Sequence, residues 1–262
     1  MPKLAANLSM LFTELPFIER FSAAANFGFQ GVEYLFPYAF DAHEIKAELD
    51  RNHLKQVLFN LPAGDWDAGD RGIAADPSRV DEFRAGVALA IEYAKVLECD
   101  QVNCLAGIVP DGVSLQEAEA TLIENLKFAN DALEKAGIRL VAEAINTRDI
   151  PGFALTNTQQ ALRVYEAVGS DNFSLQYDIY HMQIMEGDIA PTLSSTLDKI
   201  GHIQLADNPG RHEPGTGELN YHFLLKHIDD IGYQGWVGCE YKPATTTNEG
   251  LKWLADYGQN EE

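Results

Sequence analysis

The chain has 262 residues, of which 40 are acidic and 19 are basic, so its formal net charge is −21 at pH 7 with neutral histidines. A protein this acidic is repelled by nucleic acids and anionic membranes unless clustered Lys and Arg override the field, and the sequence holds no such cluster. Hydrophobic residues make up 46% of the chain, which is ordinary for a globular protein and unlike a disordered one. We therefore expect no nucleic-acid or membrane partner.

Short apolar segments alternate with longer segments of helical period along the chain. The predicted strands are residues 3–7, 31–35, 55–59, 101–105, 139–143, 174–178, 202–205 and 236–240. Helix starts are indicated by Asp41, by Asp76 before Pro77, by Ser114 and by Thr246. This alternation is typical of βα units around a parallel sheet. No linker divides the chain, so we expect an α/β fold, a single (β/α)8 TIM barrel over residues 1–262.

The three longest irregular segments, residues 60–76, 144–157 and 206–220, each follow a predicted strand. In a (β/α)8 barrel such loops lie at the C-terminal end of the strands, where active sites are built. None of them carries a dinucleotide-binding glycine motif, a phosphate-binding P-loop or a nucleophile elbow. The sequence therefore gives no support for a nucleotide cofactor or a serine nucleophile.

Three cysteines, Cys99, Cys104 and Cys239, are too few and too irregularly spaced for a disulfide framework or a zinc site. We interpret them as buried thiols of a cytoplasmic, reducing compartment. The apolar N-terminal segment lacks a convincing cleavage site, and we expect it to be the first strand rather than a signal peptide. No apolar run approaches the ~18 residues that a membrane span requires.

Oxygen-bearing side chains end the fifth to eighth predicted strands: Glu143, Asp178, Gln204 and Glu240. They are spaced by about one βα unit, so consecutive strands of a barrel would bring them to one point at its mouth. Three carboxylates so placed repel one another unless a divalent cation joins them, and an all-oxygen set favours Mg²⁺ or Mn²⁺ over zinc. For any one of them alone, a helix cap or a loop salt bridge explains the residue equally well.

Basic side chains near these strand ends are candidates for binding an anionic substrate. His181 lies three residues beyond Asp178, and Arg211 lies in the loop after the seventh strand, where it is the natural anion anchor. Lys242 follows Glu240 and is a further candidate, although a solvated loop charge is the alternative interpretation.

Two further polar residues are interpreted as structural. Glu33 lies at the end of the second predicted strand, with an extra polar contact to the site as the alternative, and His202 begins the seventh strand, at the bottom of the barrel.

Seven blocks spread over nearly the whole chain carry a family resemblance. They are NLSMLF (7–12), LFPY (35–38), NLPAGDW (60–66), QYDIYHMQ (176–183), QLADNP (204–209), HEPGTGE (212–218) and GWVGCEYKP (235–243). Together they resemble the bacterial hydroxypyruvate isomerase family of the xylose isomerase-like TIM barrels. The resemblance implies that Glu143, Asp178, Gln204 and Glu240 are divalent-metal ligands, and that Glu143 and Glu240 are the catalytic proton donor and acceptor. It also implies that His181 and Arg211 contact substrate, as in related ketose epimerases.

The resemblance implies an aldose-ketose type isomerase of glyoxylate metabolism. Its expected reaction is the interconversion of hydroxypyruvate and 2-hydroxy-3-oxopropanoate by metal-assisted proton transfer through an enediolate. A 2-oxotetronate isomerase or a ketose epimerase with the same site is the alternative, and a non-catalytic small-molecule-binding barrel is a further one. The epimerases usually carry His where this chain has Gln204, which argues against a ketohexose substrate. A DNA-repair endonuclease on the same barrel is disfavoured, because it would need a His-rich zinc cluster and a basic groove.

Overall fold

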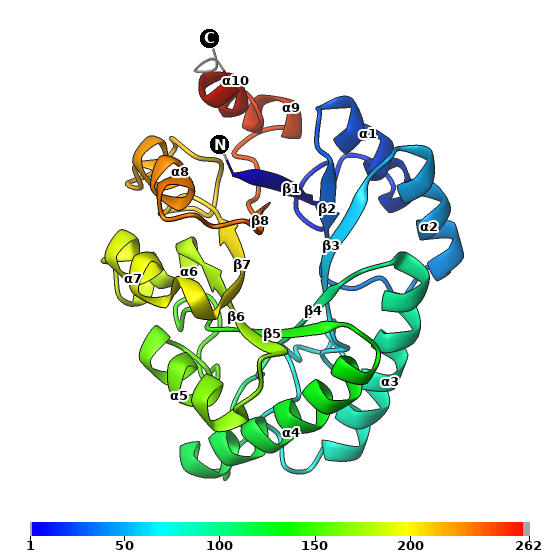
Figure 1. The fold of residues 1–262 in the computed structure, drawn as a ribbon, viewed down its shortest axis with the longest axis vertical. Helices are drawn as coiled ribbons and strands as arrows, with labels where there is room; N and C mark the ends of the chain where they lie inside the picture. Colours follow the sequence, from blue (N-terminus) through cyan, green and yellow to red (C-terminus); the bar gives the residue numbers. More distant parts are fainter. Residues whose placement is uncertain (1, 259–262) are drawn as a thin grey trace.

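Eight parallel strands close into a barrel in chain order, so that β1 pairs with both β2 and β8 (Figure 1). The computed structural model describes residues 2–258. The strands are β1 (Lys3–Asn7), β2 (Gly31–Glu33), β3 (Lys55–Asn60), β4 (Gln101–Cys104), β5 (Arg139–Glu143), β6 (Phe173–Asp178), β7 (Ile200–Leu205) and β8 (Trp236–Cys239). The predicted (β/α)8 barrel is confirmed, and each predicted strand boundary lies within two residues of the observed one.

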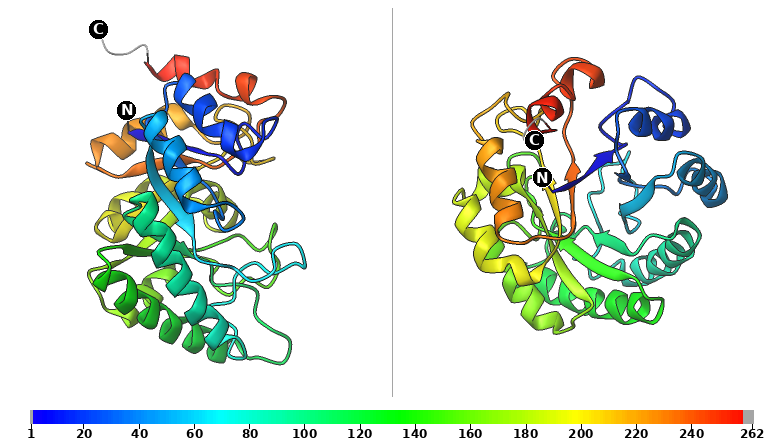
Figure 2. Two further views of the ribbon diagram at one scale, coloured as in Figure 1. Left: turned by 90° about the vertical axis from the view of Figure 1, so that its right-hand side faces the viewer. Right: turned by 45° about the horizontal axis from the view of Figure 1, so that its top comes forward.

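Helices surround the barrel and connect one strand to the next. They are η1 (Phe17–Glu19), α1 (Arg20–Asn26), α2 (Ala42–Arg51), α3 (Val80–Leu97), α4 (Leu115–Lys135), α5 (Thr158–Val168), α6 (Ile179–Met185), α7 (Ile189–Thr196), η2 (Leu197–Lys199), α8 (Tyr221–Asp230), α9 (Thr247–Gly250) and α10 (Trp253–Gly258). In the outer ring, α9 and α10 lie between α8 and α1, which closes the circle of helices (Figures 1 and 2). None of the helices within residues 2–258 is long and apolar enough to cross a membrane.

Three of the four predicted helix starts are confirmed as N-caps. The side chains of Asp41, Ser114 and Thr246 each accept a backbone N–H from the first turn of their helix. The start predicted at Asp76 is wrong, because α3 begins at Val80. Asp76 instead accepts the N–H and the hydroxyl of Ser78, so its carboxylate closes a local turn and is not available to cap a helix.

The core has two parts, separated by the sheet. The larger part lies between the strands and the helices and includes a buried face of α3 formed by Phe83, Val87, Ala90 and Ala94. A smaller apolar cluster, formed by Ala5, Val57, Leu58 and Val141 with Trp236 packed against it, fills the barrel interior near the strand starts. Closer to the strand ends the interior becomes polar, which is where the candidate site lies.

The cysteines behave as the sequence suggests. All three are buried and free of disulfides. Burial raises the pKa of Cys99 and Cys104 to about 12, so neither thiol ionises near neutral pH. We therefore exclude both as nucleophiles.

His202 lies deeper in the barrel wall than predicted. Strand β7 begins two residues earlier than expected, so His202 is its third residue and lies beside Gln176 of β6 instead of starting the strand at the bottom of the barrel. Its side chain is fully buried.

Helix α4 offers a matched test of the outer core. Leu122 is fully buried and Leu115 is 69% exposed, so L122A opens a cavity that L115A does not. We expect L122A to lower the free energy of unfolding by roughly 2–5 kcal/mol and L115A to change it by less than about 0.5 kcal/mol, as measured by urea denaturation. Equal losses in the two variants would contradict this packing of α4.

Candidate active site

A cavity opens at the C-terminal end of the barrel, and every strand or the loop that follows it contributes to its lining. The residues that line it are Asn7, Met10, Glu33, Tyr34, Leu35, Leu58, Asn60, Trp66, Leu105, Glu143, Ile145, Ile150, Gln176, His181, Gln204, Arg211 and Glu240. The three long loops predicted to border the site supply Trp66, Ile145, Ile150 and Arg211. The position agrees with that of active sites in this fold.

Strand register explains why polar groups from neighbouring strands meet inside the barrel. Glu143 of β5 lies beside Gln176 of β6, and Asp178 of β6 lies beside Gln204 of β7. Because side chains alternate between the two faces of a strand, Gln176 and Asp178 point to the same side. The barrel therefore places these four side chains in adjacent levels of its interior.

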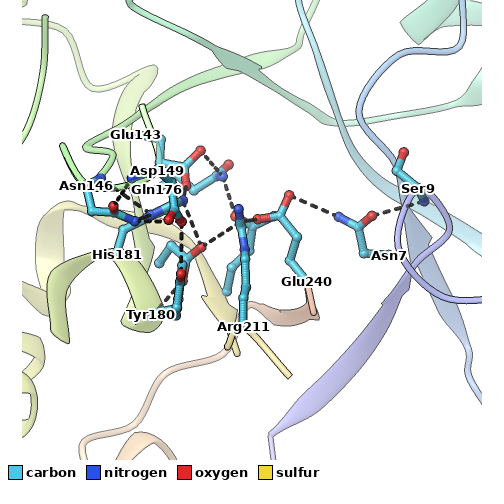
Figure 3. A network of polar contacts seen from close by, with 12 residues as sticks. Asn7, Ser9, Glu143, Asn146, Asp149, Gln176, Tyr180, His181, Arg211 and Glu240 are labelled. Atoms are coloured by element: carbon cyan, nitrogen blue, oxygen red, sulfur yellow. Dashed lines mark hydrogen bonds and ion pairs between the residues drawn. The ribbon is translucent and has the colours of Figure 1, made fainter. Parts of the chain in front are cut away.

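Three carboxylates and one imidazole form a tight buried cluster in the cavity. Ligand atoms from Glu143, Asp178, His181 and Glu240 all lie within 4.8 Å of one another. Figure 3 shows Glu143, His181 and Glu240 of this cluster. Two unit charges 4 Å apart repel by roughly 4 kcal/mol at an effective dielectric constant of about 20. The cluster thus needs protons or positive charge for compensation, and its donor atoms are suited to a metal ion.

The pKa values of the three carboxyl groups reflect this repulsion and their burial. Burial, together with the charges of Glu240 and Asp178, raises the pKa of Glu143 well above its usual value. Burial also raises the pKa of Asp178, although Arg211 opposes the shift. For Glu240, burial outweighs the opposing effect of Arg211 and raises the pKa to about 8. These acids therefore hold protons more strongly than exposed carboxyl groups do.

Arg211 supplies positive charge to the cluster. Its Nη2 donates to Oε2 of Glu240 at 2.5 Å (Figure 3). The same nitrogen lies 3.4 Å from Oδ2 of Asp178. Its guanidinium also stacks 5.1 Å from the ring of Tyr180. Among the described residues that line the cavity, Arg211 is the one Lys or Arg side chain. Burial lowers the pKa of Arg211, but the nearby carboxylates outweigh burial and raise it, so the group stays charged.

The loop that carries Arg211 is organised by the buried Asp207. Its carboxylate accepts backbone N–H bonds from Asn208, Gly215, Gly217 and Leu219 at 2.9–3.1 Å. A side chain at Gly217 would clash with this carboxylate and with the carbonyl of Asn208. The backbone N–H of Lys242 also donates to the carbonyl of Arg211, which ties the loop to the end of β8.

His181 is oriented by its neighbour Asn146. The backbone N–H of Asn146, which can only donate, lies 3.4 Å from Nδ1 of His181, and the Asn146 side-chain nitrogen lies 2.6 Å from the same atom. Burial, reinforced by Arg211, holds the pKa of His181 well below its usual range, so the ring is neutral. With Nδ1 as acceptor, the ring proton belongs on Nε2, which faces Asp178 at 3.5 Å and Glu143 at 3.7 Å. This tautomer makes His181 a hydrogen-bond donor toward the cavity.

The structure unites six of the seven site residues predicted from the sequence. Glu143, Asp178, His181 and Glu240 form the cluster, Arg211 contacts two of them, and Gln204 lines the same cavity. The metal-ligand role of Gln204 stays a prediction, since its Oε1 accepts a hydrogen bond from Nε2 of Gln176 at 2.6 Å. Lys242 is exposed and does not line the cavity, so the arrangement does not support its predicted substrate contact.

Several amide side chains of the site were missed by sequence reasoning. Nε2 of Gln176 donates to Glu143 at 3.0 Å, Nδ2 of Asn103 lies 3.5 Å from the same carboxylate, and Nδ2 of Asn7 lies 3.4 Å from Oε1 of Glu240. For Gln176 a signal was present, because it stands two residues before Asp178 on the same strand and therefore on the same face. Asn7 and Asn103 have no such marked partner in sequence.

Comparison with known proteins assigns the family. Residues 21–257 match the family model described as xylose isomerase-like TIM barrel. This chain belongs to the xylose isomerase-like TIM barrel family. Among its relatives, it is 55% identical to the hydroxypyruvate isomerase of Escherichia coli (strain K12) over 98% of this chain and 100% of that protein. It is 47% identical to the 2-oxo-tetronate isomerase of Cupriavidus necator over 98% of this chain and 99% of that protein.

Solved structures give the same picture of this xylose isomerase-like barrel. The crystal structure of a protein described as AP endonuclease, family 2, from Brucella melitensis has a TM-score of 0.95 to this chain. The two sequences are 46% identical, and the match covers 98% of this chain and 99% of that one.

The Asp207 anchor gives a local prediction. In D207N one carboxylate oxygen becomes an NH2 group that cannot accept hydrogen bonds, so loop N–H groups lose their partner. A loss of roughly 1–2 kcal/mol would accelerate exchange of the two amides bonded to the replaced oxygen, Gly215 and Gly217 for Oδ2 or Asn208 and Leu219 for Oδ1, about 5- to 30-fold, as measured by hydrogen–deuterium exchange. The exposed variant D111N is the control, and unchanged exchange in D207N would contradict the anchoring role.

The raised pKa of Glu240 predicts how the metal-free protein responds to pH. Its usual value is 4.5 and the folded value is about 8, so the folded state binds this proton more tightly than the unfolded state. The contribution of this proton to the free energy of unfolding is fully present below pH 4.5 and is lost as the pH rises toward 8. In chelator-treated protein, Tm should therefore fall more steeply between pH 5 and 8 in the wild type than in E240Q. If Tm falls equally steeply with pH in the wild type and in E240Q, the raised pKa of Glu240 is refuted.

Proposed function

We propose that this chain is an isomerase that interconverts hydroxypyruvate and 2-hydroxy-3-oxopropanoate. The reaction moves a proton between C3 and C2 through an enediolate, while an oxygen-bound proton moves between the two adjacent oxygens. The full-length similarity to the Escherichia coli protein of that name supports this substrate. The chemistry of the cavity supports the reaction type.

The observation that carries the proposal is the convergence of Glu143 and Glu240 in one buried cavity. They come from β5 and from the end of β8, and their carboxylates lie within the 4.8 Å cluster. In the metal-free protein burial raises the pKa of both, to about 8 for Glu240, and an acid whose pKa lies near the working pH, as that of Glu240 does, can both accept and donate a proton. One glutamate would remove the carbon-bound proton, and the other would return it or move a proton between the oxygens.

The donor set fits a divalent cation. Oε1 of Glu143 is buried and has no hydrogen-bond partner within residues 2–258, which leaves one cluster oxygen free to bind a cation. We propose that Glu143, Asp178 and Glu240 hold the ion with Gln204, and that oxygen ligands favour Mg²⁺ or Mn²⁺. When bound, such an ion stabilises negative charge that develops on the substrate oxygens.

The remaining polar groups of the cavity would bind and orient the substrate. Arg211 is placed to pair with the substrate carboxylate, which would compete with Glu240 and Asp178 for the guanidinium. The Nε2–H of His181 would donate to a substrate oxygen. Local binding of this kind is required, because the net charge of −21 repels an anion at long range.

An aromatic wall would limit access of water to the intermediate. Trp66 lines the cavity and is packed 5.1 Å from the ring of Phe36, with the guanidinium of Arg71 4.3 Å from its own ring. Excluding water protects a reactive enediolate and strengthens the electrostatic interactions that stabilise it.

The same site suits a longer 2-oxo acid, and the similarity to the 2-oxo-tetronate isomerase supports that alternative.

DNA cleavage is not supported: the cluster contains one histidine among three carboxylates, and the chain is strongly acidic. We further propose that the enzyme acts in glyoxylate metabolism in the cytoplasm, where its buried thiols stay reduced.

The substrate and the two glutamates are tested together. Wild-type protein with Mg²⁺ or Mn²⁺ is assayed by NMR on hydroxypyruvate, 2-oxo-tetronate and ketohexoses in D2O, which reports both product and deuterium incorporation. We expect hydroxypyruvate to be turned over, and E143Q and E240Q each to lose about 10²–10⁴-fold in kcat, since each removes a general acid-base group.

E134Q, which changes an exposed glutamate of α4, is the matched control and should keep wild-type activity. Absence of turnover on hydroxypyruvate would refute the proposed substrate, and turnover of 2-oxo-tetronate instead would favour the alternative. Full activity in E143Q or E240Q would refute the catalytic assignment.

A further inference from the structure

A fourth buried carboxyl group, that of Glu33, lies near the cluster of Glu143, Asp178 and Glu240. It has no part in the reaction described above. Glu33 of β2 and His202 of β7 are both fully buried, and Nε2 of His202 donates to Oε2 of Glu33 at 2.7 Å. The carboxylate reaches across the barrel through space that Gly238 of β8 leaves open. A Cβ at residue 238 would clash with both carboxylate oxygens. The absence of a side chain at this position is therefore needed for the pair to form.

The other oxygen of Glu33 receives two amide donors. Its Oε1 accepts from Nε2 of Gln204 at 2.7 Å and from Nδ2 of Asn7 at 3.0 Å. Together with His202, these donors engage both carboxylate oxygens. Glu33 is thus fully occupied by the protein, although it borders the cavity.

A carboxylate only accepts hydrogen bonds, whereas an amide has a donor end and an acceptor end. Glu33 therefore requires the NH2 groups of Gln204 and Asn7 to face it. With Gln204 in this orientation, its Oε1 points away and accepts from Nε2 of Gln176, which also donates to Oε2 of Glu143 at 3.0 Å. The orientation of one amide thus sets that of the next.

The same carboxylate influences the other catalytic glutamate through a shorter route. Nδ2 of Asn7 lies between Oε1 of Glu33 and Oε1 of Glu240. Figure 3 shows Asn7 reaching Glu240 through this amide, while its Oδ1 accepts from the N–H of Ser9. Rotation of this amide by 180° would place an oxygen against two carboxylates. Glu33 thus lies at the origin of two hydrogen-bond chains that end on Glu143 and on Glu240.

We propose that Glu33, held by His202 in the space beside Gly238, is the positioning residue that orients the amides of Asn7, Gln204 and Gln176 and thereby holds both catalytic glutamates in place. The proposal rests on the proposed function, because it assigns Glu143 and Glu240 to the reaction. Glu33 itself acts through these amides and not on the substrate.

The direct test is E33Q, which keeps the size of the side chain and replaces one acceptor oxygen by an NH2 group. Its first readout needs neither metal nor substrate: the side-chain amide signals of Asn7, Gln176 and Gln204 are followed by ¹H–¹⁵N NMR in metal-free protein. We expect all three to shift in E33Q. We expect G238A to shift the same signals, because it displaces the Glu33 carboxylate without removing its charge.

The second readout is kinetic and uses whichever acid of the substrate panel the wild type converts. Loss of a supporting partner commonly costs 10- to 100-fold, so we expect kcat to fall by roughly that factor in E33Q while KM changes less than about threefold. L122A, destabilised far from the cavity, is the control and should keep both kinetic constants at a temperature where it is folded.

The outcomes separate this proposal from the proposed function. Amide signals that stay in place in E33Q overturn the positioning role, whether or not kcat falls, and so do shifted signals with unchanged kcat. If the wild type converts none of the acids, the proposed function fails, while the NMR comparison still decides whether Glu33 sets the amide orientations.

Discussion

The burial of three like-charged groups at one end of the barrel is the constraint on which the rest of the structure depends. Glu143, Asp178 and Glu240 are brought together by closure of the sheet and are at most 5% exposed, so bulk solvent screens their repulsion poorly. Arg211 offsets part of the charge, and raised pKa values allow protons to offset more of it. A divalent cation would complete the compensation, so the features that make the site costly for the fold are those that suit it to proton transfer.

The carboxylates and the guanidinium of Arg211 are held in the site by different parts of the fold. The carboxylates stand on or beside strands, whose positions are set by backbone hydrogen bonds around the whole barrel. Arg211 stands on a loop that is organised by the buried carboxylate of Asp207 and by a backbone hydrogen bond from Lys242. In the proposed function, proton transfer is thus assigned to side chains held by the strands, and binding of the substrate anion to a side chain held by a loop. A chain of net charge −21 would bind the proposed anionic substrate through such local contacts, since their attraction is confined to a few ångströms.

The fold and most of the site followed from local patterns. Strand boundaries were predicted to within two residues because each strand is a short apolar run, and the strand-end carboxylates stood out as polar residues in apolar surroundings. The prediction at Asp76 was wrong because a turn closed by Ser78 competes for the same carboxylate. Lys242 was placed near Glu240 by its position in the chain, but its side chain is exposed and outside the cavity.

The sequence by itself determined the barrel and the carboxylates at its mouth, because alternation and strand ends are properties of neighbouring residues. Only the tertiary structure decided which groups touch. It paired Glu33 with His202, 169 residues away in the chain, set the donor face of His181 and brought Arg211 onto Glu240. Such contacts depend on register and closure across the barrel, and no local pattern encodes the direction in which a buried amide or imidazole presents its proton.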